Sequence, residues 1–294
     1  MNDDWIVESA PSKINLTLSV FGRQSDGYHL LQSLVVFTEF GDELSLLKGN
    51  EFSLTVDGPF AGDIEGENVI QKIAKNLIKD FDIDGIGAVR LWKELPVAAG
   101  VGGGTADAGA FVRLVQRLFE GKVDPSDLRG FAAQFGADVP VCIQSCPSIM
   151  YGYGEKLLPL KTFPQMGILL VNPRIQISTG EVFSNLNMSA DERSYDFKAL
   201  ETLSAGFHSI DDVIAYMNSV PNDLTKPAIA ICSDVQTVIE TISRIENCRV
   251  ARMSGSGATC FGLFETVAAA KTAAATLEKK YPGWWIRSSR VLPC

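Results

Sequence analysis

The sequence predicts an α+β fold rather than a doubly wound parallel sheet. Strand-like runs crowd the start of the chain, before the first helical pattern: residues 14–20, 30–37, 43–47 and 52–56. Helices then mix with strands without the regular strand–helix alternation that a parallel sheet requires. A length of 294 residues allows two domains. We place their boundary near residue 150, which gives domains at 1–150 and 151–294.

Three helices are expected in the first half, each from a start signal. Asn68 is a candidate N-cap ahead of an apolar stripe, a second helix begins near Thr105, and Asp124 caps a third with Pro125 at its first position and Gly136 after its end. Further runs predict strands at 89–92, 149–153, 167–171, 249–253, 260–264 and 285–291, and helices at 211–217, 234–245 and 267–280.

The first strand-like run alternates in a way that sets the direction of its polar residues. Ile14 and the apolar residues that follow at every second position share one face, while Lys13 and Asn15 share the other. Side chains two apart on a strand point the same way. We therefore expect Lys13 and Asn15 to face a common environment.

Composition and charge exclude several classes of protein. The chain is 46% hydrophobic and 21% charged, which is ordinary for a globular protein, and no apolar stretch reaches the roughly 18 residues of a membrane span. The start Met1-Asn2-Asp3-Asp4-Trp5 lacks the basic residues of an export or transit signal, so a cytoplasmic protein is expected. A net charge of −9 counts against nucleic-acid binding.

The cysteines give no metal or disulfide pattern. Without an export signal, reduced thiols are expected, and a lone C-x₃-C is weak metal evidence. The six cysteines are Cys142, Cys146, Cys232, Cys248, Cys260 and Cys294.

The glycine-rich segment at residues 95–108 carries the strongest functional signal. It places Gly100, Gly102, Gly103 and Gly104 directly before an amphipathic helix that starts near Thr105. Bare backbone N–H groups at a helix N-terminus form a site for phosphate oxygens. The alternative is a flexible turn, but turns rarely contain four glycines beside a helix start.

Two common phosphate motifs do not fit this segment. In a P-loop a Gly-Lys pair precedes Ser or Thr, whereas Gly121-Lys122 precedes Val123. In a dinucleotide fingerprint a third glycine follows three residues after Gly102, where this chain has Thr105.

Three further segments have both a structural and a functional interpretation. Asp138, in Gly136-Ala137-Asp138-Val139-Pro140, is either a turn residue or a carboxylate on a loop that enters the protein. The Asp-Gly turn before Tyr28-His29 leaves the role of the histidine open. The small-residue loop at 252–258 is either a tight hairpin or a close approach to a ligand.

Taken together, five segments resemble the motifs of the GHMP kinases and occur in the same order. The segments lie at 11–16, 26–29, 96–108, 136–140 and 253–258, and the resemblance runs over nearly the whole chain, from about Pro11 to Phe264. The strings Lys-Ile-Asn-Leu, Asp-Gly-Tyr-His and Gly-Ala-Asp-Val-Pro resemble the branch that phosphorylates the 2-hydroxyl of 4-diphosphocytidyl-2-C-methyl-D-erythritol in the non-mevalonate isoprenoid pathway. The resemblance implies two domains, for ATP and for substrate, with the active site in a cleft between them.

The resemblance also implies roles for individual residues. Asp138 would take the proton of the substrate hydroxyl, and Lys13 beside it would neutralise developing charge. Tyr28 would stack on the cytosine, and His29 would hydrogen-bond its edge. Residues that would complete substrate binding are Asn15, Thr179 and Phe183, where Phe183 would cover the other face of the base.

ATP, carried as its Mg²⁺ complex, is the implied co-substrate, and no organic prosthetic group is expected. Residues implied to bind ATP are Pro96, Gly100, Gly102, Gly103, Gly104, Thr105 and Asp107. Ala98 and Ala99 stand where the family usually has glycines, and Ala106 stands where a second hydroxyl residue is usual. The metal ligands are therefore left unassigned, and the sequence is silent on oligomeric state.

Two rival functions share parts of this pattern. Another GHMP kinase, acting on homoserine or mevalonate, would have the glycine loop without Asp-Gly-Tyr-His. A non-catalytic nucleotide-binding module would have no need of both Lys13 and Asp138. Neither a nucleic acid nor a membrane is an expected partner.

Overall fold

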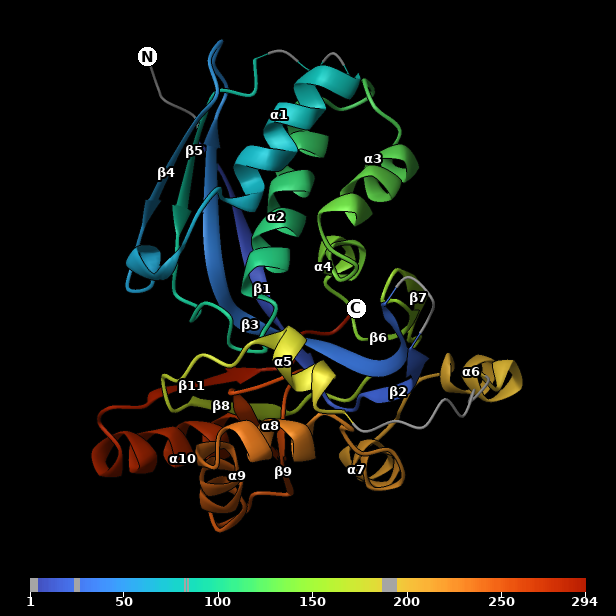
Figure 1. The fold of residues 1–294 in the computed structure, drawn as a ribbon, viewed down its shortest axis with the longest axis vertical. Coiled ribbons are helices and arrows are strands. Elements are labelled where there is room, and N and C mark those ends of the chain that lie inside the picture. Colours follow the sequence, from blue (N-terminus) through green and yellow to red (C-terminus); the bar gives the residue numbers. More distant parts are fainter. Residues whose placement is uncertain (1–4, 24–26, 82, 84, 187–194) are drawn as a thin grey trace. The chain divides into compact units, whose positions relative to one another are not determined.

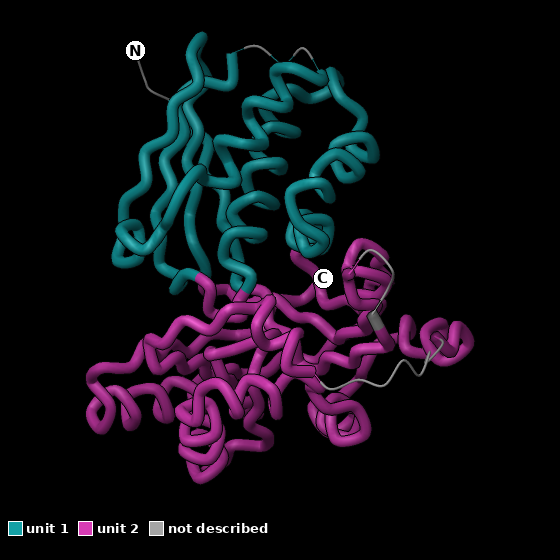
Figure 2. The backbone as a smooth tube through the Cα atoms, viewed as in Figure 1, with its two compact units in different colours: residues 1–12, 41–97, 102–144 teal, residues 13–40, 98–101, 145–294 magenta. Residues whose placement is uncertain are grey.

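The computed structural model describes residues 5–23, 27–81, 83, 85–186 and 195–294. Its mixture of helices and antiparallel strands confirms the predicted α+β class. The chain forms two compact units (Figure 2): unit 1 contains residues 1–12, 41–97 and 102–144, and unit 2 contains residues 13–40, 98–101 and 145–294. The division into halves at residue 150, with a cleft between them, stays a prediction.

In its described part, unit 1 combines strands with helices, which lie together on one side of β3 (His29–Leu47), β4 (Ser53–Asp57) and β5 (Ala88–Trp92) in Figure 1. In unit 1, the second half of β3 pairs antiparallel with β5, and β5 pairs parallel with β4. Its elements are the first part of β1 (Ile6–Asn15), the second part of β3 (His29–Leu47), β4 (Ser53–Asp57), α1 (Val69–Phe81), β5 (Ala88–Trp92), α2 (Gly103–Leu118), α3 (Pro125–Ala132) and α4 (Val139–Gln144), with 3₁₀ turns at Ala61–Asp63 and Ala133–Phe135.

In unit 2, β8, β9, β10 and β11 form an antiparallel sheet in the order β11-β8-β10-β9. Helices α9 and α10 pack against that sheet (Figure 1). The first half of β3 pairs with β2 and β6. The elements new here are β2 (Ser19–Arg23), β6 (Ser148–Gly152), β7 (Lys156–Pro159), β8 (Gly167–Asn172), α5 (Thr179–Ser184), α6 (Phe197–Leu203), α7 (Ile210–Ser219), α8 (Thr225–Ile231), α9 (Asp234–Ser243), β9 (Val250–Met253), β10 (Cys260–Phe264), α10 (Val267–Lys280) and β11 (Trp285–Arg290).

The predicted helix starts are confirmed by their capping bonds. The N–H of Ile70 donates to Asn68 Oδ1 at 2.9 Å, and the N–H of Ser126 donates to Asp124 Oδ1 at 2.7 Å. Each bond satisfies a donor that a helix leaves unpaired at its start. The long helices of the second half begin and end within two residues of their predicted bounds.

The strand predicted at residues 14–20 is wrong in its bounds. The chain forms β1 up to Asn15 and begins β2 only at Ser19. Lys13, Asn15 and Thr17 are as buried as the apolar residues between them. Both faces of this segment are covered by other parts of the protein, which makes its polar face an interior one.

The expectation of reduced thiols is wrong for one pair. Cys146 and Cys294 form a disulfide with a Cα–Cα distance of 4.8 Å, within the range that a disulfide requires. They lie 148 positions apart, so no spacing pattern relates them. Cys142, Cys232, Cys248 and Cys260 remain thiols. Of the helices in the described part of the chain, none combines the length and apolar character needed to cross a bilayer.

Candidate functional site

The glycine loop comprises residues 96–105, and within unit 2 its Gly100 packs against the Ser-Gly-Ser-Gly loop at residues 254–257. Ser254 Oγ donates to the carbonyl of Gly100 at 2.8 Å, and the N–H of Asn15 donates to Ser254 Oγ at 3.1 Å. Gly100 has φ +74°, and a Cβ there would lie 2.5 Å from the Ser254 carbonyl oxygen. The fold itself therefore requires glycine at position 100.

The glycines at the start of α2 differ in what surrounds them. Gly102 is the N-cap residue with φ 64°, and Thr105 Oγ1 donates back to its carbonyl at 2.9 Å. A Cβ on Gly103 would lie 3.1 Å from Lys93 Nζ, whereas a Cβ on Gly104 would have no described heavy atom within 4 Å. Packing does not explain Gly104, so its missing side chain leaves room for a ligand beside the helix N-terminus.

A buried ion cluster of Lys93, Asp42 and Asp107 supports the glycine loop. Lys93 Nζ donates to Asp42 Oδ2 at 2.5 Å and to Asp107 Oδ2 at 2.6 Å, and the three side chains are 3%, 0% and 2% exposed. Asp42 Oδ1 also accepts the N–H groups of Glu94 and Leu95, at 2.6 and 2.8 Å. The cluster thus joins β3, the end of β5 and the first turn of α2.

The cluster contains one more carboxylate than it has cations. Burial, opposed by Lys93 and reinforced by Asp42, raises the pKa of Asp107 to about 8. Asp107 Oδ1 is buried and has no hydrogen-bond partner among the described residues. The carboxylate predicted to bind ATP therefore faces the lysine inside unit 1.

Asp138 directly precedes α4 and belongs to its first turn. Its carbonyl accepts the N–H of Cys142 at 3.2 Å, and the N–H of Val139 donates to the carbonyl of Gly136 at 3.0 Å. Sequence reasoning treated this segment as a loop and missed α4, because six residues containing Pro140 show no helical period.

Lys13 and Asn15 lie in unit 2, at the end of β1, and both are buried. The N–H of Lys13 donates to the carbonyl of Val101 in the glycine loop at 3.0 Å. Asn15 Nδ2 donates to Ser33 Oγ at 2.7 Å. These bonds fix the backbone at Lys13 and the side chain of Asn15.

Two residues predicted to bind the cytosine meet in unit 2. The rings of His29 and Phe183, 154 positions apart, stack with centroids 4.9 Å apart and an interplanar angle of 30°. Tyr28 is 68% exposed and meets the ring of Tyr153 edge-on at 6.0 Å. Asp26, of the same motif, lies outside the described residues.

The remaining predicted residues are Thr179 in unit 2 and Pro96 in unit 1. Thr179, the first residue of α5, shares a hydrogen bond of 2.9 Å with Ser256 Oγ. Pro96 is buried where the glycine loop begins. Two residues that sequence reasoning missed are Lys93 and Asp42, which lie 51 positions apart and belong to no spacing motif.

Metal binding by protein side chains alone finds no support in the described residues. Among them, no three His, Cys, Asp or Glu side chains gather closely enough to hold an ion. Mg²⁺ commonly binds through substrate phosphates and water with only one or two protein ligands.

Comparisons with known proteins agree with this geometry. Family models described as "GHMP kinases N terminal domain" and "GHMP kinases C terminal" match residues 68–145 and 197–283. A curated protein of Paramagnetospirillum magneticum named 4-diphosphocytidyl-2-C-methyl-D-erythritol kinase is 43% identical, over 96% of this chain and 97% of its own. One of the same name from Parvibaculum lavamentivorans is 40% identical, over 97% of each chain.

Solved structures show the same fold. A crystal structure of 4-(cytidine 5'-diphospho)-2C-methyl-D-erythritol kinase superimposes with a TM-score of 0.75 at 28% identity, over 97% of this chain and 99% of that one. Homoserine kinase from Cytophaga hutchinsonii gives a TM-score of 0.72 at 17% identity, over 100% of this chain and 96% of that one, which shows the shared fold alone.

Proposed function

This chain belongs to the GHMP kinase family, and we propose that it phosphorylates the 2-hydroxyl of 4-diphosphocytidyl-2-C-methyl-D-erythritol with ATP as phosphoryl donor. The observation that carries the proposal is 43% identity maintained over 96% of the chain to a relative of that name. The stacking of His29 on Phe183 supports it, because it brings together two residues that would bind the cytosine of the substrate.

The proposed chemistry is a direct phosphoryl transfer. The substrate 2-hydroxyl oxygen bonds to the γ-phosphorus of ATP, the bond from that phosphorus to the β–γ bridging oxygen breaks, and ADP leaves with that oxygen. Asp138 accepts the hydroxyl proton as the new bond forms, and Lys13 neutralises charge on the transferring group. Such reactions require mainly positioning and charge neutralisation from the protein.

Binding of the two substrates is assigned to different parts of the chain. The glycine loop from Gly100 to Thr105 is assigned to the ATP phosphates, with open space at Gly104 and the N-terminus of α2 in support. Tyr28, His29 and Phe183 are assigned to the cytosine. Asn15 and Thr179 would contact the rest of the diphosphocytidyl substrate. Asp107 would contribute to ATP binding indirectly, by accepting the hydrogen bond from Lys93 in the buried ion cluster beside the loop.

The cellular setting belongs to the same proposal. ATP is the co-substrate of a kinase, and we assign Mg²⁺ to the bound nucleotide. We place the reaction in the non-mevalonate route to isoprenoid precursors and in the cytoplasm.

The test measures ADP release and phosphorylated product with four acceptors: the cytidine substrate, its uridine analogue, 2-C-methylerythritol 4-phosphate and homoserine. We expect kcat/KM for the cytidine substrate to exceed that for each of the others, because only it both stacks in the proposed cytosine site and matches the hydrogen bonds at the edge of the base. Higher efficiency on homoserine would return the protein to another branch of the family.

Asp138→Asn tests the proposed proton acceptor, since it keeps the shape of the side chain and removes the carboxylate that would accept the proton. We expect its turnover to fall by about 100-fold or more with little change in substrate binding. An Asn variant that keeps more than about a tenth of wild-type turnover would show that Asp138 is not the base.

A further inference from the structure

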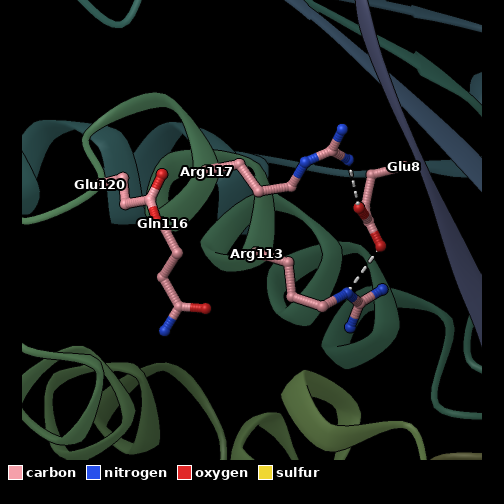
Figure 3. Close-up of a pocket in the computed structure, with 5 residues that line it drawn as sticks. All are labelled: Glu8, Arg113, Gln116, Arg117 and Glu120. Carbon is pink, nitrogen blue, oxygen red and sulfur yellow. Dashed lines mark hydrogen bonds and ion pairs between the residues drawn. The ribbon is translucent and has the colours of Figure 1, made fainter.

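An arginine in α2 is hydrogen-bonded to both β1 and α4. A surface pocket of about 490 Å³ in unit 1 is lined by Glu8, Arg113, Gln116, Arg117 and Glu120, and Figure 3 shows the guanidinium groups of both arginines directed toward Glu8. Arg113 Nε donates to Glu8 Oε1 at 2.8 Å, and its Nη2 donates to the carbonyl of Ser9 at 2.6 Å. Its Nη1 donates to the carbonyls of Cys142 and Ile143, at 2.6 and 3.3 Å.

The pocket itself does not favour a charged ligand. Its two arginines are matched by two glutamates in its lining, and Glu8 already accepts from both arginines. The side chain of Arg113 is only 19% exposed. Its hydrogen bonds therefore serve the interior of unit 1.

Arg113 is the last of three α2 residues that hold Cys142 of α4. Thr105, Gly109 and Arg113 are spaced by four and share one helix face. Thr105 Oγ1 accepts from the Cys142 thiol at 3.7 Å, and a Cβ on Gly109 would lie 2.7 Å from the Cys142 carbonyl carbon. The first of the three belongs to the proposed phosphate loop, so a single helix face connects that loop to α4.

Cys142 is in turn hydrogen-bonded, through its backbone, to Asp138, the proposed acceptor of the substrate proton. Its N–H donates to the carbonyl of Asp138 at 3.2 Å, and residues 139–143 of α4 are buried. A helix this short is marginal by itself. A cation on the carbonyls at its C-terminal end completes bonds that the helix leaves open.

We propose that Arg113 is a positioning residue, which acts through α4 to hold Asp138 in the orientation that proton transfer requires. This inference rests on the proposed function, because it takes Asp138 as the base. Glu8 is its partner, since that carboxylate fixes the guanidinium from the side of β1. A base displaced by about 1 Å can lose as much as 100-fold in rate.

Arg117 offers a matched control one turn along the same helix. It shares Glu8 at 3.0 Å, but its other hydrogen bond goes to the carbonyl of Val7 in β1. Arg117→Gln and Arg113→Gln therefore remove the same charge and share the same carboxylate. Only Arg113→Gln removes a hydrogen-bond donor to the carbonyls of α4.

The experiment is a double-mutant cycle on the full chain. We expect Arg113→Gln to lower kcat by about 10- to 100-fold with KM for ATP and for the cytidine substrate unchanged within about twofold, and Arg117→Gln to leave kcat unchanged. In an Asp138→Asn background, Arg113→Gln should cause no further loss, because the residue through which it acts is already gone. Arg113→Lys should restore part of kcat, since one ammonium can reach a carbonyl but cannot replace the whole fork.

Each other outcome overturns the inference. An equal loss of kcat from Arg113→Gln in both backgrounds would show a merely structural role, and wild-type kcat would show no role. If Arg113→Gln does not fold, Arg113→Lys is carried through the same cycle and decides in its place. Full activity of Asp138→Asn alone would instead contradict the proposed function, which keeps the two failures distinct.

Discussion

The residues assigned to the two substrates are held by the protein in opposite ways. Below the glycine loop, Lys93 and its two carboxylates are almost completely buried and bond to one another. At the proposed cytosine site, which we call the base side, Tyr28 is 68% exposed and meets the ring of Tyr153 edge-on. The rings of His29 and Phe183 stack on each other. The proposed phosphate side therefore rests on a cluster that is built into the folded core, whereas Tyr28 of the proposed base side lies at the surface.

This difference determines what a substitution will change. A buried charge that loses its partner remains desolvated, so the cost appears as lost stability. An exposed ring that is removed leaves the core intact, so the cost appears as lost affinity. Four predictions test this separation, and they are ordered from the largest expected effect to the smallest.

Lys93→Met should lower the free energy of unfolding by about 3–5 kcal/mol, because it leaves Asp42 and Asp107 buried without their cation. Urea denaturation measures the change. The matched control is Lys75→Met, whose ion pair with Glu67 is exposed to solvent and should contribute far less to stability. Equal effects of the two substitutions would contradict the view that burial makes the phosphate side structural.

Tyr28→Ala should leave the unfolding free energy within about 0.5 kcal/mol of wild type and weaken binding of the cytidine substrate by about 1–3 kcal/mol, the contribution of one stacked base. It should affect cytidine and uridine substrates alike, since every base has a π-face. His29→Ala should instead reduce the preference for cytidine, because only edge hydrogen bonds distinguish the two bases. The measurement is kcat/KM for both substrates, and an unchanged preference in His29→Ala would refute the edge role.

Stability should depend on pH through Asp107. Burial raises the pKa of Asp107 to about 8 from an ordinary 3.8, so between these values the folded state holds a proton that the unfolded chain lacks. That contribution is complete at acid pH, falls as the pH rises, and is lost above about pH 8. Between pH 6 and 8 the wild type should lose up to about 1.4 kcal/mol per pH unit relative to Asp107→Asn. Parallel stability profiles for the two proteins would rule this out.

Ala98→Gly should give the smallest change, in the segment where the chain passes from one unit to the other. Ala98 is exposed and has φ 52°, a left-handed conformation that costs an alanine about 1 kcal/mol or more. Glycine avoids this strain but is more flexible when unfolded, so the net gain should be about 0.5 kcal/mol. Thermal unfolding would reveal it, and a loss of stability would mean that the alanine methyl group makes contacts that outweigh its strain.

Features with a local cause could be predicted from the sequence. Asn68 and Asp124 start helices because a cap acts within three residues of its position, and α10 shows a clear helical period over 14 residues. The glycine loop was found because a helix start follows it directly in the chain.

Features that depend on distant partners could not be predicted. Lys93 lies between Trp92 and Glu94, where a lysine is ordinarily solvated, and its burial depends on Asp42, which is 51 positions away. The disulfide of Cys146 joins residues 148 positions apart. Short elements such as α4 were missed for a different reason, because six residues are too few to establish a period.

Gly104 and Gly109 look alike in the sequence, yet selection would act on substitutions at the two positions for different reasons. Replacing Gly109 brings a side chain against the Cys142 backbone, so variants there would disappear from a cell as misfolded protein. Replacing Gly104 meets open space, so, given its proposed role beside the ATP phosphates, variants there would reach normal abundance but lose activity. A population under selection would thus keep one glycine through protein quality control and the other through metabolic demand.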